Sequence, residues 1–309
     1  MHFNWGIRFF RRYQKLPEDE VNEQVEVPSK IAAFLNFRTR HIAKHLILID
    51  WEIFKNIKFE ELSSCGWAWS RTESCAPNVV KFLERFNNIT HWTVDTIFSG
   101  TTPAMRASVL KKFIKLIQHL HYRNDFQSSY AVLFGLQIES IQRLHETWEL
   151  LSSNKVKTFK YFCSFYSSKN NYAKLRKYMA KLISVHNFPC IPYLALYLED
   201  LMKIHRENPG PAICNLRRIT LMMDVIYLIQ KFQKSSKKSI PLCHASSKPE
   251  VRNYCLSINF SKEEQKFLRS RKSQKSEIEK IPERLLKIVK WKLFSLDLNF
   301  IAVKKREDL

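Results

Sequence analysis

The stretch at residues 191–231, IPYLALYLEDLMKIHRENPGPAICNLRRITLMMDVIYLIQK, contains two amphipathic runs separated by the break NPGP at 208–211. Pro192 suits the first turn of the first helix, where the missing N–H of proline costs nothing. In both runs apolar residues recur at helical spacing, at Leu194, Tyr197, Leu198, Leu201, Met202 and Ile204 and then at Leu216, Ile219, Met222, Met223, Ile226 and Ile229. The stretch predicts a helical hairpin. Periodicity alone leaves open whether its helices lie in a core or project from a larger body.

Helical periodicity continues through most of the chain, and the alternation typical of strands is almost absent. The pattern predicts an all-α fold of about ten helices. Helices are expected at 78–98, from Pro103 onward, and at 126–136, 138–151, 156–166 and 170–184. Residues 61–77, which include two tryptophans, are predicted to form a loop, and YCLSINF at 254–260 a short extended piece.

Composition divides the chain into three segments. Residues 1–30 form a predicted N-terminal tail, in which a basic aromatic piece precedes an acidic connector. Residues 31–260 are the predicted body, with a polar break expected at KSSKKS, residues 234–239. Residues 261–309 are a basic tail, predicted to be helical in part because apolar residues recur at helical spacing between 278 and 289. Whether this tail packs on the body, meets a membrane or stays in solvent is open.

The net charge of +22 predicts attraction to an acidic partner, which could be nucleic acid, an anionic membrane or an acidic protein face. The seven cysteines are scattered and never form C-x-x-C, a pattern that favours reduced thiols in a cytoplasmic protein. No uninterrupted apolar segment is long enough to span a bilayer, and residues 1–15 lack the apolar run of a signal peptide.

The sequence shows no arrangement of residues that predicts covalent catalysis. The phosphate-binding patterns G-x-x-x-x-G-K and G-x-G-x-x-G are absent, as are the common hydrolase, protease and kinase motifs. His41 and His45 have the four-residue spacing of a zinc pair, but no third ligand is close in sequence, so we expect ordinary surface histidines. We predict no cofactor, no metal and no catalytic residue, and therefore a protein that works by binding.

Seven segments, taken in their order along the chain, resemble the catalytic domain of Ras-type guanine nucleotide exchange factors (the CDC25-homology or RasGEF domain). They are IAKHLILIDWEIFKNIKFEEL at 42–62, WS at 69–70, APNVVKFLERFNNITHWTVDTIF at 76–98, MRASVLKKFIKLIQHLHYRNDFQSSYAVLFGLQIESIQRLHETWELL at 105–151, NNYAKLRKYM at 170–179, CIPYLALYLEDL at 190–201 and CNLRRIT at 214–220. The resemblance covers about residues 35–235 and implies a multi-helix body with a protruding hairpin. The PYLxxxLxDL, FNN and GLQ elements look closer to the Ral-directed branch, that of the Ral guanine nucleotide dissociation stimulator, than to the Ras-directed one.

The resemblance implies a guanine nucleotide exchange factor that promotes GDP release from a Ras-superfamily small GTPase. In this family the body holds the switch 2 region, and the hairpin wedges switch 1 away from the nucleotide, without a change in any covalent bond. A Ral-like GTPase is the expected partner, with Ras and Rap as alternatives. The expected location is the cytoplasm, with recruitment to the inner face of the plasma membrane left open because of the net charge.

Family positions carried over residue by residue give two sets. The predicted GTPase-binding residues are Arg106, Tyr130, Gln137, Tyr172, Tyr193, Met202 and Arg206. The residues predicted to shape the hairpin are Pro192, Tyr197, Leu198, Asp200 and Leu201. For Tyr130 and Tyr172, helix packing is an equally open interpretation. Arg143, Leu144 and Trp148 are predicted to be core and interhelix contacts.

The hairpin is also where the chain departs from the family pattern. Arg206 stands where Ras-directed members have a glutamate, the turn ENPGPAIC is short, and the family's K-R-R-K element is reduced to Leu216, Arg217 and Arg218. The alternative is therefore a member that binds a GTPase but does not exchange its nucleotide. A basic helical protein that binds nucleic acid is a less favoured alternative, because the chain has no recognised nucleic-acid-binding motif.

Overall fold

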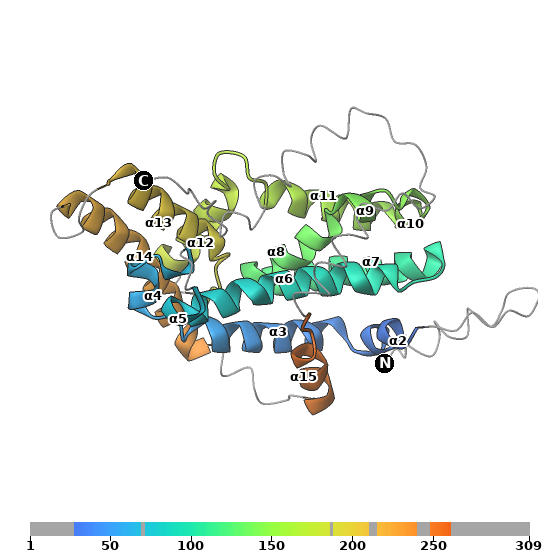
Figure 1. Cartoon of the computed structure of the whole chain (residues 1–309). Coiled ribbons are helices and arrows are strands. Elements are labelled where there is room, and N and C mark those ends of the chain that lie inside the picture. Colours follow the sequence, from blue (N-terminus) through green and yellow to red (C-terminus); the bar gives the residue numbers. More distant parts are fainter. Residues whose placement is uncertain (1–27, 69–71, 186–187, 210–214, 240–247, 261–309) are drawn as a thin grey trace, which may run out of the picture.

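The computed structural model describes residues 28–68, 72–185, 188–209, 215–239 and 248–260 (Figure 1). Within these ranges the chain is helical without a strand, and the predicted all-α class is confirmed. The helices are α2 (Ser29–Asn36), α3 (Thr39–Phe54), α4 (Phe59–Ser63), η1 (Gly66–Ala68), α5 (Thr72–Cys75), α6 (Pro77–Phe98), α7 (Pro103–Tyr122), α8 (Phe126–Leu136), α9 (Glu139–Gln142), α10 (His145–Glu149), α11 (Ser153–Phe165), α12 (Ala173–Val185), α13 (Ala195–Glu207), α14 (Leu216–Ser239) and α15 (Pro249–Leu256). The predicted tails at 1–30 and 261–309 lie almost entirely outside the described residues.

Three long helices, α3, α6 and α7, lie side by side and form the centre of the body (Figure 1). Helix α8 packs against both α6 and α7, and α15 packs on α3. The pair α13 and α14 lies at one end of this arrangement, and α9 and α10 lie at the other (Figure 1). One hydrophobic core runs through the body, from Ile31 to Ile258.

Aromatic rings join the N-terminal helices to the centre of the body. The ring of Phe34 in α2 stacks on Phe113 of α7 with a centroid distance of 4.4 Å. Trp92 of α6 meets both rings edge-on, at 5.4 Å from Phe34 and 5.0 Å from Phe113. Edge-to-face and offset stacked pairs of this kind stabilise a core by about 0.5–1.5 kcal/mol beyond their buried area.

A buried polar network connects four helices of the core. Asp50 of α3 is fully buried, and its Oδ1 accepts a hydrogen bond from Nε of Arg85 in α6 at 3.1 Å. The hydroxyl of Ser128 in α8 donates to the other carboxylate oxygen of Asp50. Nη1 of Arg85 donates to the carbonyl of Cys255 in α15 at 3.3 Å. The network therefore fixes α3, α6, α8 and α15 relative to one another.

A second buried carboxyl lies beside this network. Asp125 is the N-cap of α8, and its Oδ1 accepts the backbone N–H of Ser128 at 3.0 Å. Burial and the neighbouring Asp50 carboxyl raise the pKa of Asp125 well above its usual value. Burial also raises the pKa of Asp50, although Arg85 opposes that change. Two buried carboxyls thus lie near one guanidinium, and only Asp50 accepts a hydrogen bond from it among the bonds of the described residues.

Most predicted helices match those observed, but two segments in the first half of the chain differ. Residues 138–151 contain two short helices, α9 and α10, because the chain turns at Arg143 and Leu144. The segment 61–77 is not a plain loop, since it contains η1 and α5. The carboxylate of Glu61 satisfies the start of α6 by accepting the backbone N–H groups of Asn78 and Val79, at 2.8 and 3.0 Å. A cap supplied from a distant residue leaves no local sequence pattern.

The C-terminal part of the body was also predicted wrongly at two places. The expected break at 234–239 is absent, because α14 continues to Ser239. Gln233 holds this end of the helix by donating to the carbonyls of Phe54 and Ile57, both at 2.9 Å. Residues 254–256 of the expected extended piece belong to α15, in which the Tyr254 hydroxyl accepts a hydrogen bond from the Trp92 indole at 3.1 Å. Tertiary contacts override weak local propensity in both cases.

The prediction of two surface histidines is wrong. His45 is buried, and His41 is half-buried. Both lie in α3, which packs against α6, α7, α8 and α15 and therefore has little exposed surface. Among the described residues, no group of three His, Cys, Asp or Glu side chains is placed to hold a metal ion.

We expect Arg85→Ala to lower the free energy of unfolding by about 3–5 kcal/mol, because it leaves the buried Asp50 without its guanidinium. The matched control is Lys30→Ala, which removes an exposed ion pair with Asp95 (side chains 66% and 20% exposed) and should cost less than about 1 kcal/mol. Urea unfolding measures both. Equal losses for the two variants would contradict a central role for the network.

We expect Asp125→Asn to flatten the decline of stability with rising pH. Because the pKa of Asp125 is raised in the folded state, the folded protein binds more protons than the unfolded chain above the ordinary Asp pKa, and stability falls as pH increases. Between the ordinary Asp pKa and the raised pKa of Asp125, the free energy of unfolding falls by about 1.4 kcal/mol for each pH unit. Asparagine still caps α8 and has no proton to lose. Unfolding at pH 5 and pH 8 tests this, and an unchanged slope would contradict it.

Candidate functional site

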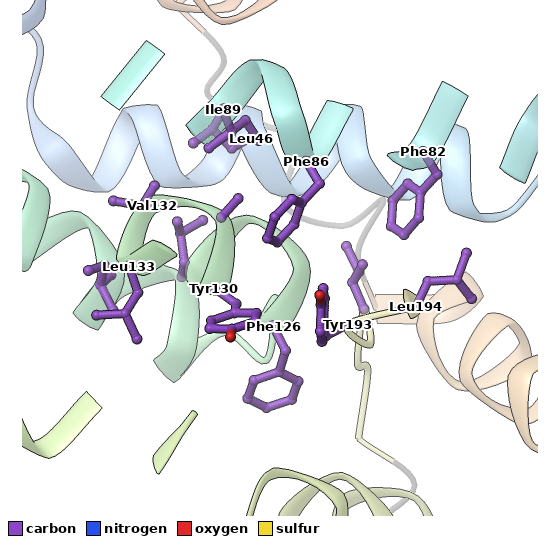
Figure 2. Packing of buried hydrophobic residues seen from close by; sticks show 14 of the residues in the cluster. Leu46, Phe82, Phe86, Ile89, Phe126, Tyr130, Val132, Leu133, Tyr193 and Leu194 are labelled. Carbon is purple, nitrogen blue, oxygen red and sulfur yellow. The ribbon is translucent and has the colours of Figure 1, made fainter. Parts of the chain in front are cut away.

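Three of the predicted GTPase-binding tyrosines meet in one cluster, which we call the tyrosine cluster: Tyr130 of α8, Tyr172 just before α12, and Tyr193 just before α13. The hydroxyls of Tyr130 and Tyr172 lie 3.3 Å apart and share a hydrogen bond. The ring centroid of Tyr193 lies 4.8 Å from that of Tyr130 and 6.1 Å from that of Tyr172. Figure 2 shows Tyr130, Tyr193 and Phe86 of α6 pointing toward one another.

The cluster is nearly closed to solvent. The side chains of Tyr130, Tyr172 and Tyr193 are only 5%, 8% and 4% exposed. Burial raises the pKa of each phenol, so all three hydroxyls are neutral hydrogen-bonding groups. The packing interpretation of Tyr130 and Tyr172 is confirmed, and their contact with a GTPase stays a prediction.

Tyr172 reaches the cluster through an unusual backbone. Asn170, Asn171 and Tyr172 have φ values of 50°, 53° and 56°, a run of three left-handed residues. Asparagine tolerates this conformation, whereas a bulky side chain such as tyrosine pays roughly 1–2 kcal/mol for it. The burial of Tyr172 and its bond to Tyr130 offset that strain and fix the start of α12 beside the cluster.

Main-chain hydrogen bonds hold the segment that leads into the hairpin against the start of α8. The N–H of Ile191 donates to the carbonyl of Asn124, and the N–H of Phe126 donates to the carbonyl of Ile191, both at 2.9 Å. Gln127 adds a side-chain link, because its amide donates to the carbonyl of Phe82 at 3.2 Å and accepts the N–H of Leu194 at 3.3 Å.

This extended segment corrects the prediction for Pro192. Helix α13 begins at Ala195, so Pro192 precedes the helix instead of lying in its first turn. Ile191 forms the isolated bridge with Asp125. Its extended conformation agrees with the steric restriction that proline places on the residue before it.

The other residues predicted to shape the hairpin make contacts that agree with such a role, which stays a prediction. Tyr197, Leu198 and Leu201 are buried along one side of α13, and the ring of Tyr197 packs on Phe232 of α14 at 5.6 Å. Asp200 accepts two hydrogen bonds from the guanidinium of Arg176 in α12, at 2.7 and 2.9 Å. Arg176 also donates to the carbonyl of Leu196 at 3.2 Å. These bonds agree with the predicted structural role of Asp200 in the hairpin, which stays a prediction.

Met202 and Arg206 lie four residues apart on α13 and therefore share a face of the helix. Met202 is half-buried against the core, and Arg206 is exposed. At the far end of the hairpin, Asn215 caps α14 by accepting the N–H of Arg218 at 2.9 Å. Asn215 and Arg218 both donate to the carbonyl of Asn208, each at 3.3 Å, so the two helices are joined on either side of the turn.

Gln137 and Arg106 lie outside the tyrosine cluster. Gln137 is half-buried at the C-terminal end of α8, seven residues after Tyr130. Arg106 lies near the start of α7, where its guanidinium donates to the hydroxyl of Thr147 at 3.2 Å and the carbonyl of Gly100 at 3.0 Å. That end of α7 contacts α10, at the opposite end of the body from the hairpin (Figure 1). The structure therefore does not bring Arg106 to the other predicted residues.

The contacts around α9 and α10 agree with the packing roles predicted for Trp148 and Leu144, whereas the ion pair of Arg143 lies within α9 and its C-cap and joins no second helix. The indole of Trp148 donates to the carbonyl of Ile141 at 2.9 Å, and its ring packs on Phe159 at 4.8 Å. Arg143 pairs with Glu139 one helical turn earlier, and Leu144 packs partly buried on the core.

The sequence did not separate two apolar faces of α14. Met222, Ile226 and Ile229 are buried, whereas Leu216, Ile219, Met223 and Tyr227 are exposed by 76%, 40%, 43% and 54%. The exposed four follow their own helical spacing, at positions i, i+3, i+7 and i+11, so the signal was present in the sequence. The hairpin thus carries an exposed apolar stripe in addition to its buried side.

Comparison with known proteins agrees with this architecture. The RasGEF domain family matches residues 41–220, more than half of the 309 residues, and the chain belongs to this family. The predicted resemblance to the RasGEF catalytic domain is therefore confirmed.

Among its relatives are two proteins named Ras-specific guanine nucleotide-releasing factor. RalGPS2 of Macaca fascicularis is 38% identical over 228 residues, which cover 73% of this chain and 40% of the relative. RalGPS1 of Mus musculus is 35% identical over 236 residues, which cover 76% of this chain and 39% of the relative. Ras guanine nucleotide exchange factor Q of Dictyostelium discoideum is 30% identical over 203 residues, which cover 65% of this chain and 15% of the relative. The chain thus spans about two fifths of the RalGPS relatives, whose names agree with the predicted resemblance to the Ral-directed branch.

We expect Arg176→Ala to loosen α13 by about 1.5–3 kcal/mol, because it removes charge-assisted hydrogen bonds to a partly buried carboxylate. Hydrogen exchange of the α13 amides measures this local stability. Lys203→Ala is the matched control on the same helix, since its pair with Glu207 is 3.8 Å long and well exposed, and should cost less than about 0.5 kcal/mol. Equal protection of α13 in both variants would show that the Arg176–Asp200 pair does not hold the hairpin.

Proposed function

We propose that this domain is a guanine nucleotide exchange factor for a Ras-superfamily small GTPase, with a Ral-like GTPase as the preferred partner. The observation that carries the proposal is the hairpin of α13 and α14, which is held at its base and presents a partly exposed face that includes Met202 and Arg206. Family membership supplies the reaction class, and the RalGPS names of two relatives favour Ral.

Nucleotide exchange by this route requires only differential binding. A protein that binds the nucleotide-free GTPase tightly must weaken nucleotide binding by the same factor, because the two equilibria are linked. A flexible hairpin would bind the nucleotide-free GTPase less tightly, because ordering the hairpin would consume part of the binding free energy. The described part of the hairpin is ordered in advance by the tyrosine cluster, the Arg176–Asp200 pair and the contacts of Asn208 with Asn215 and Arg218.

The proposed contact surface is narrower than the set of residues predicted from the sequence. Met202 and Arg206 share a face of α13 and are partly or fully accessible, so they are the proposed hairpin contacts. The tyrosine cluster packs at the base of the hairpin, and little of its own surface is accessible to a GTPase. Gln137 lies at the edge of this region, and Arg106 is left out of the proposed interface because its guanidinium bonds within its own chain.

A second candidate is a GTPase-binding protein without exchange activity. Arg206 favours it, because this exposed cation replaces the glutamate of Ras-directed relatives and carries the opposite charge. The short connection between Asn208 and Asn215 favours it as well, since the reach of the hairpin sets how far switch 1 could be displaced.

The expected location is the cytoplasm, with recruitment to the inner face of the plasma membrane. None of the helices in the described part of the chain has the length and apolar composition needed to cross a bilayer. The net charge of +22 supports attraction to an anionic leaflet.

Release of a fluorescent GDP analogue from Ral, Ras and Rap tests the proposal. We expect the chain to accelerate release from Ral, and Met202→Asp to reduce that acceleration about tenfold or more, because it places a charge on the apolar part of the proposed face. Leu256→Asp, at an exposed leucine of α15, is the control and should leave the rate unchanged. Tyr193→Ala is a poorer probe, since removing a ring that is 4% exposed also creates a cavity.

Capture of nucleotide-free GTPase separates the two candidates. A stable complex without acceleration would favour the binding protein. Neither acceleration nor a complex with Ral, Ras or Rap, even at high protein concentration, would overturn both.

A further inference from the structure

Helices α11 and α12 present an exposed surface that the proposed exchange function does not use. On α11 the exposed residues Lys157, Lys160, Tyr161 and Ser164 follow the spacing i, i+3, i+4, i+7. On α12 the exposed residues Lys174, Lys177, Tyr178 and Lys181 follow the same spacing. Each helix therefore has one lysine-rich stripe with a tyrosine in its middle.

The two stripes meet where the C-terminal end of α11 lies beside the first half of α12, and we call the combined surface the α11–α12 face. The ammonium of Lys174 donates to the hydroxyl of Ser164 across the two helices at 2.6 Å. The ring of Phe165 lies between the two tyrosines, at 6.3 Å from Tyr161 and 5.5 Å from Tyr178. Behind the face, Phe159, Phe162, Leu175, Met179 and Leu182 are buried in the core, so the face is fixed on rigid elements.

The face is entirely cationic. No Asp or Glu occurs from Leu150 to Leu198, whereas this stretch holds lysines at 155, 157, 160, 169, 174, 177 and 181. No ion pair among the described residues involves these lysines. The one arginine of the stretch, Arg176, pairs with Asp200 of the hairpin, so this carboxylate is already matched by a cation that is not part of the face. Within the described part of the chain, none of these lysines is therefore matched by a carboxylate in an ion pair.

Two half-exposed tyrosines interrupt the lysines. Tyr161 is 57% exposed, and Tyr178 is 38% exposed with its ring stacked on His121 at a centroid distance of 5.8 Å. Tyrosine and lysine both combine an apolar body with a polar end, and both are favoured where a protein surface meets lipid headgroups. Lysine is a point charge that suits many loosely placed phosphates, whereas specific nucleic-acid contacts more often use the planar fork of arginine.

We propose that the α11–α12 face docks on an anionic phospholipid bilayer. Lysines on the face meet the headgroups, and the rings of Tyr161 and Tyr178 lie at the interface. The proposal goes beyond the proposed exchange function and does not depend on it, because the face and the hairpin contacts use different residues. Arg176 connects the two sites structurally, since it reaches from α12 to Asp200 of α13.

Flotation of the full chain with vesicles tests the proposal. The vesicles contain phosphatidylcholine alone, or phosphatidylcholine mixed with phosphatidylserine. We expect binding only to the mixed vesicles, and the triple variant Lys160→Glu, Lys177→Glu, Lys181→Glu should weaken it about a hundredfold or more. The control Lys58→Glu, Lys81→Glu, Lys248→Glu changes the net charge equally at exposed positions spread over other elements, and should weaken binding far less. Tyr161→Ser should weaken binding severalfold without a charge change.

Three results would overturn the proposal: equal loss in the two triple variants, no binding of the wild type to anionic vesicles, or loss of single-stranded RNA binding in the face variant while vesicle binding persists. The GDP-release assay on a soluble, lipid-free GTPase is run alongside. Wild-type rates in the face variant, together with lost vesicle binding, support the proposal. Vesicle binding without any acceleration of GDP release would overturn the proposed exchange function but would still support docking of the α11–α12 face on a bilayer.

Discussion

The short contact between the start of α8 and the segment at 189–194 determines where the hairpin can lie. Asn124 and Phe126 exchange main-chain hydrogen bonds with Ile191, and the amide of Asn124 donates to the carbonyl of Pro189 at 3.1 Å. These bonds replace those that a helix would have provided, so the chain crosses the body in an extended form at no cost in unsatisfied groups. Helix α13 can then begin directly beside the tyrosine cluster.

The polar core lies immediately behind this contact. Asp125, whose neighbours make these bonds, also caps α8 and faces Asp50, which is held by Arg85. Burying two carboxyls and a guanidinium is not an efficient way to stabilise a protein, because desolvation consumes much of the attraction. The hydrogen bonds of this network nevertheless fix one arrangement of α3, α6, α8 and α15. The placement of the hairpin therefore depends on polar contacts, and the apolar core around them supplies the bulk of the stability.

Much of this architecture could be predicted from the sequence, because long amphipathic helices follow from local periodicity. The hairpin, α6 and α8 were found in this way, and the contacts of Asp200 and Trp148 agree with the structural roles predicted for them. The errors share a cause: the distant cap from Glu61, the burial of His45 and the continuation of α14 past Gln233 depend on partners far away in the chain. The position of Arg106 was missed for the same reason.

The side-chain amide of Gln127 links α6 to the base of the hairpin by two hydrogen bonds. It donates to a main-chain carbonyl at Phe82 and accepts a main-chain N–H at Leu194, so both ends of the side chain are in use. Glutamate has no donor when ionised, methionine offers only a weakly accepting sulfur, and asparagine is one methylene too short. Methionine or asparagine would weaken or lose the bond to the N–H of Leu194, and glutamate would place a carboxylate oxygen against the carbonyl of Phe82. Position 127 therefore tolerates less chemical variety than the large aromatic positions around it, although its side chain contributes little apolar surface to the core.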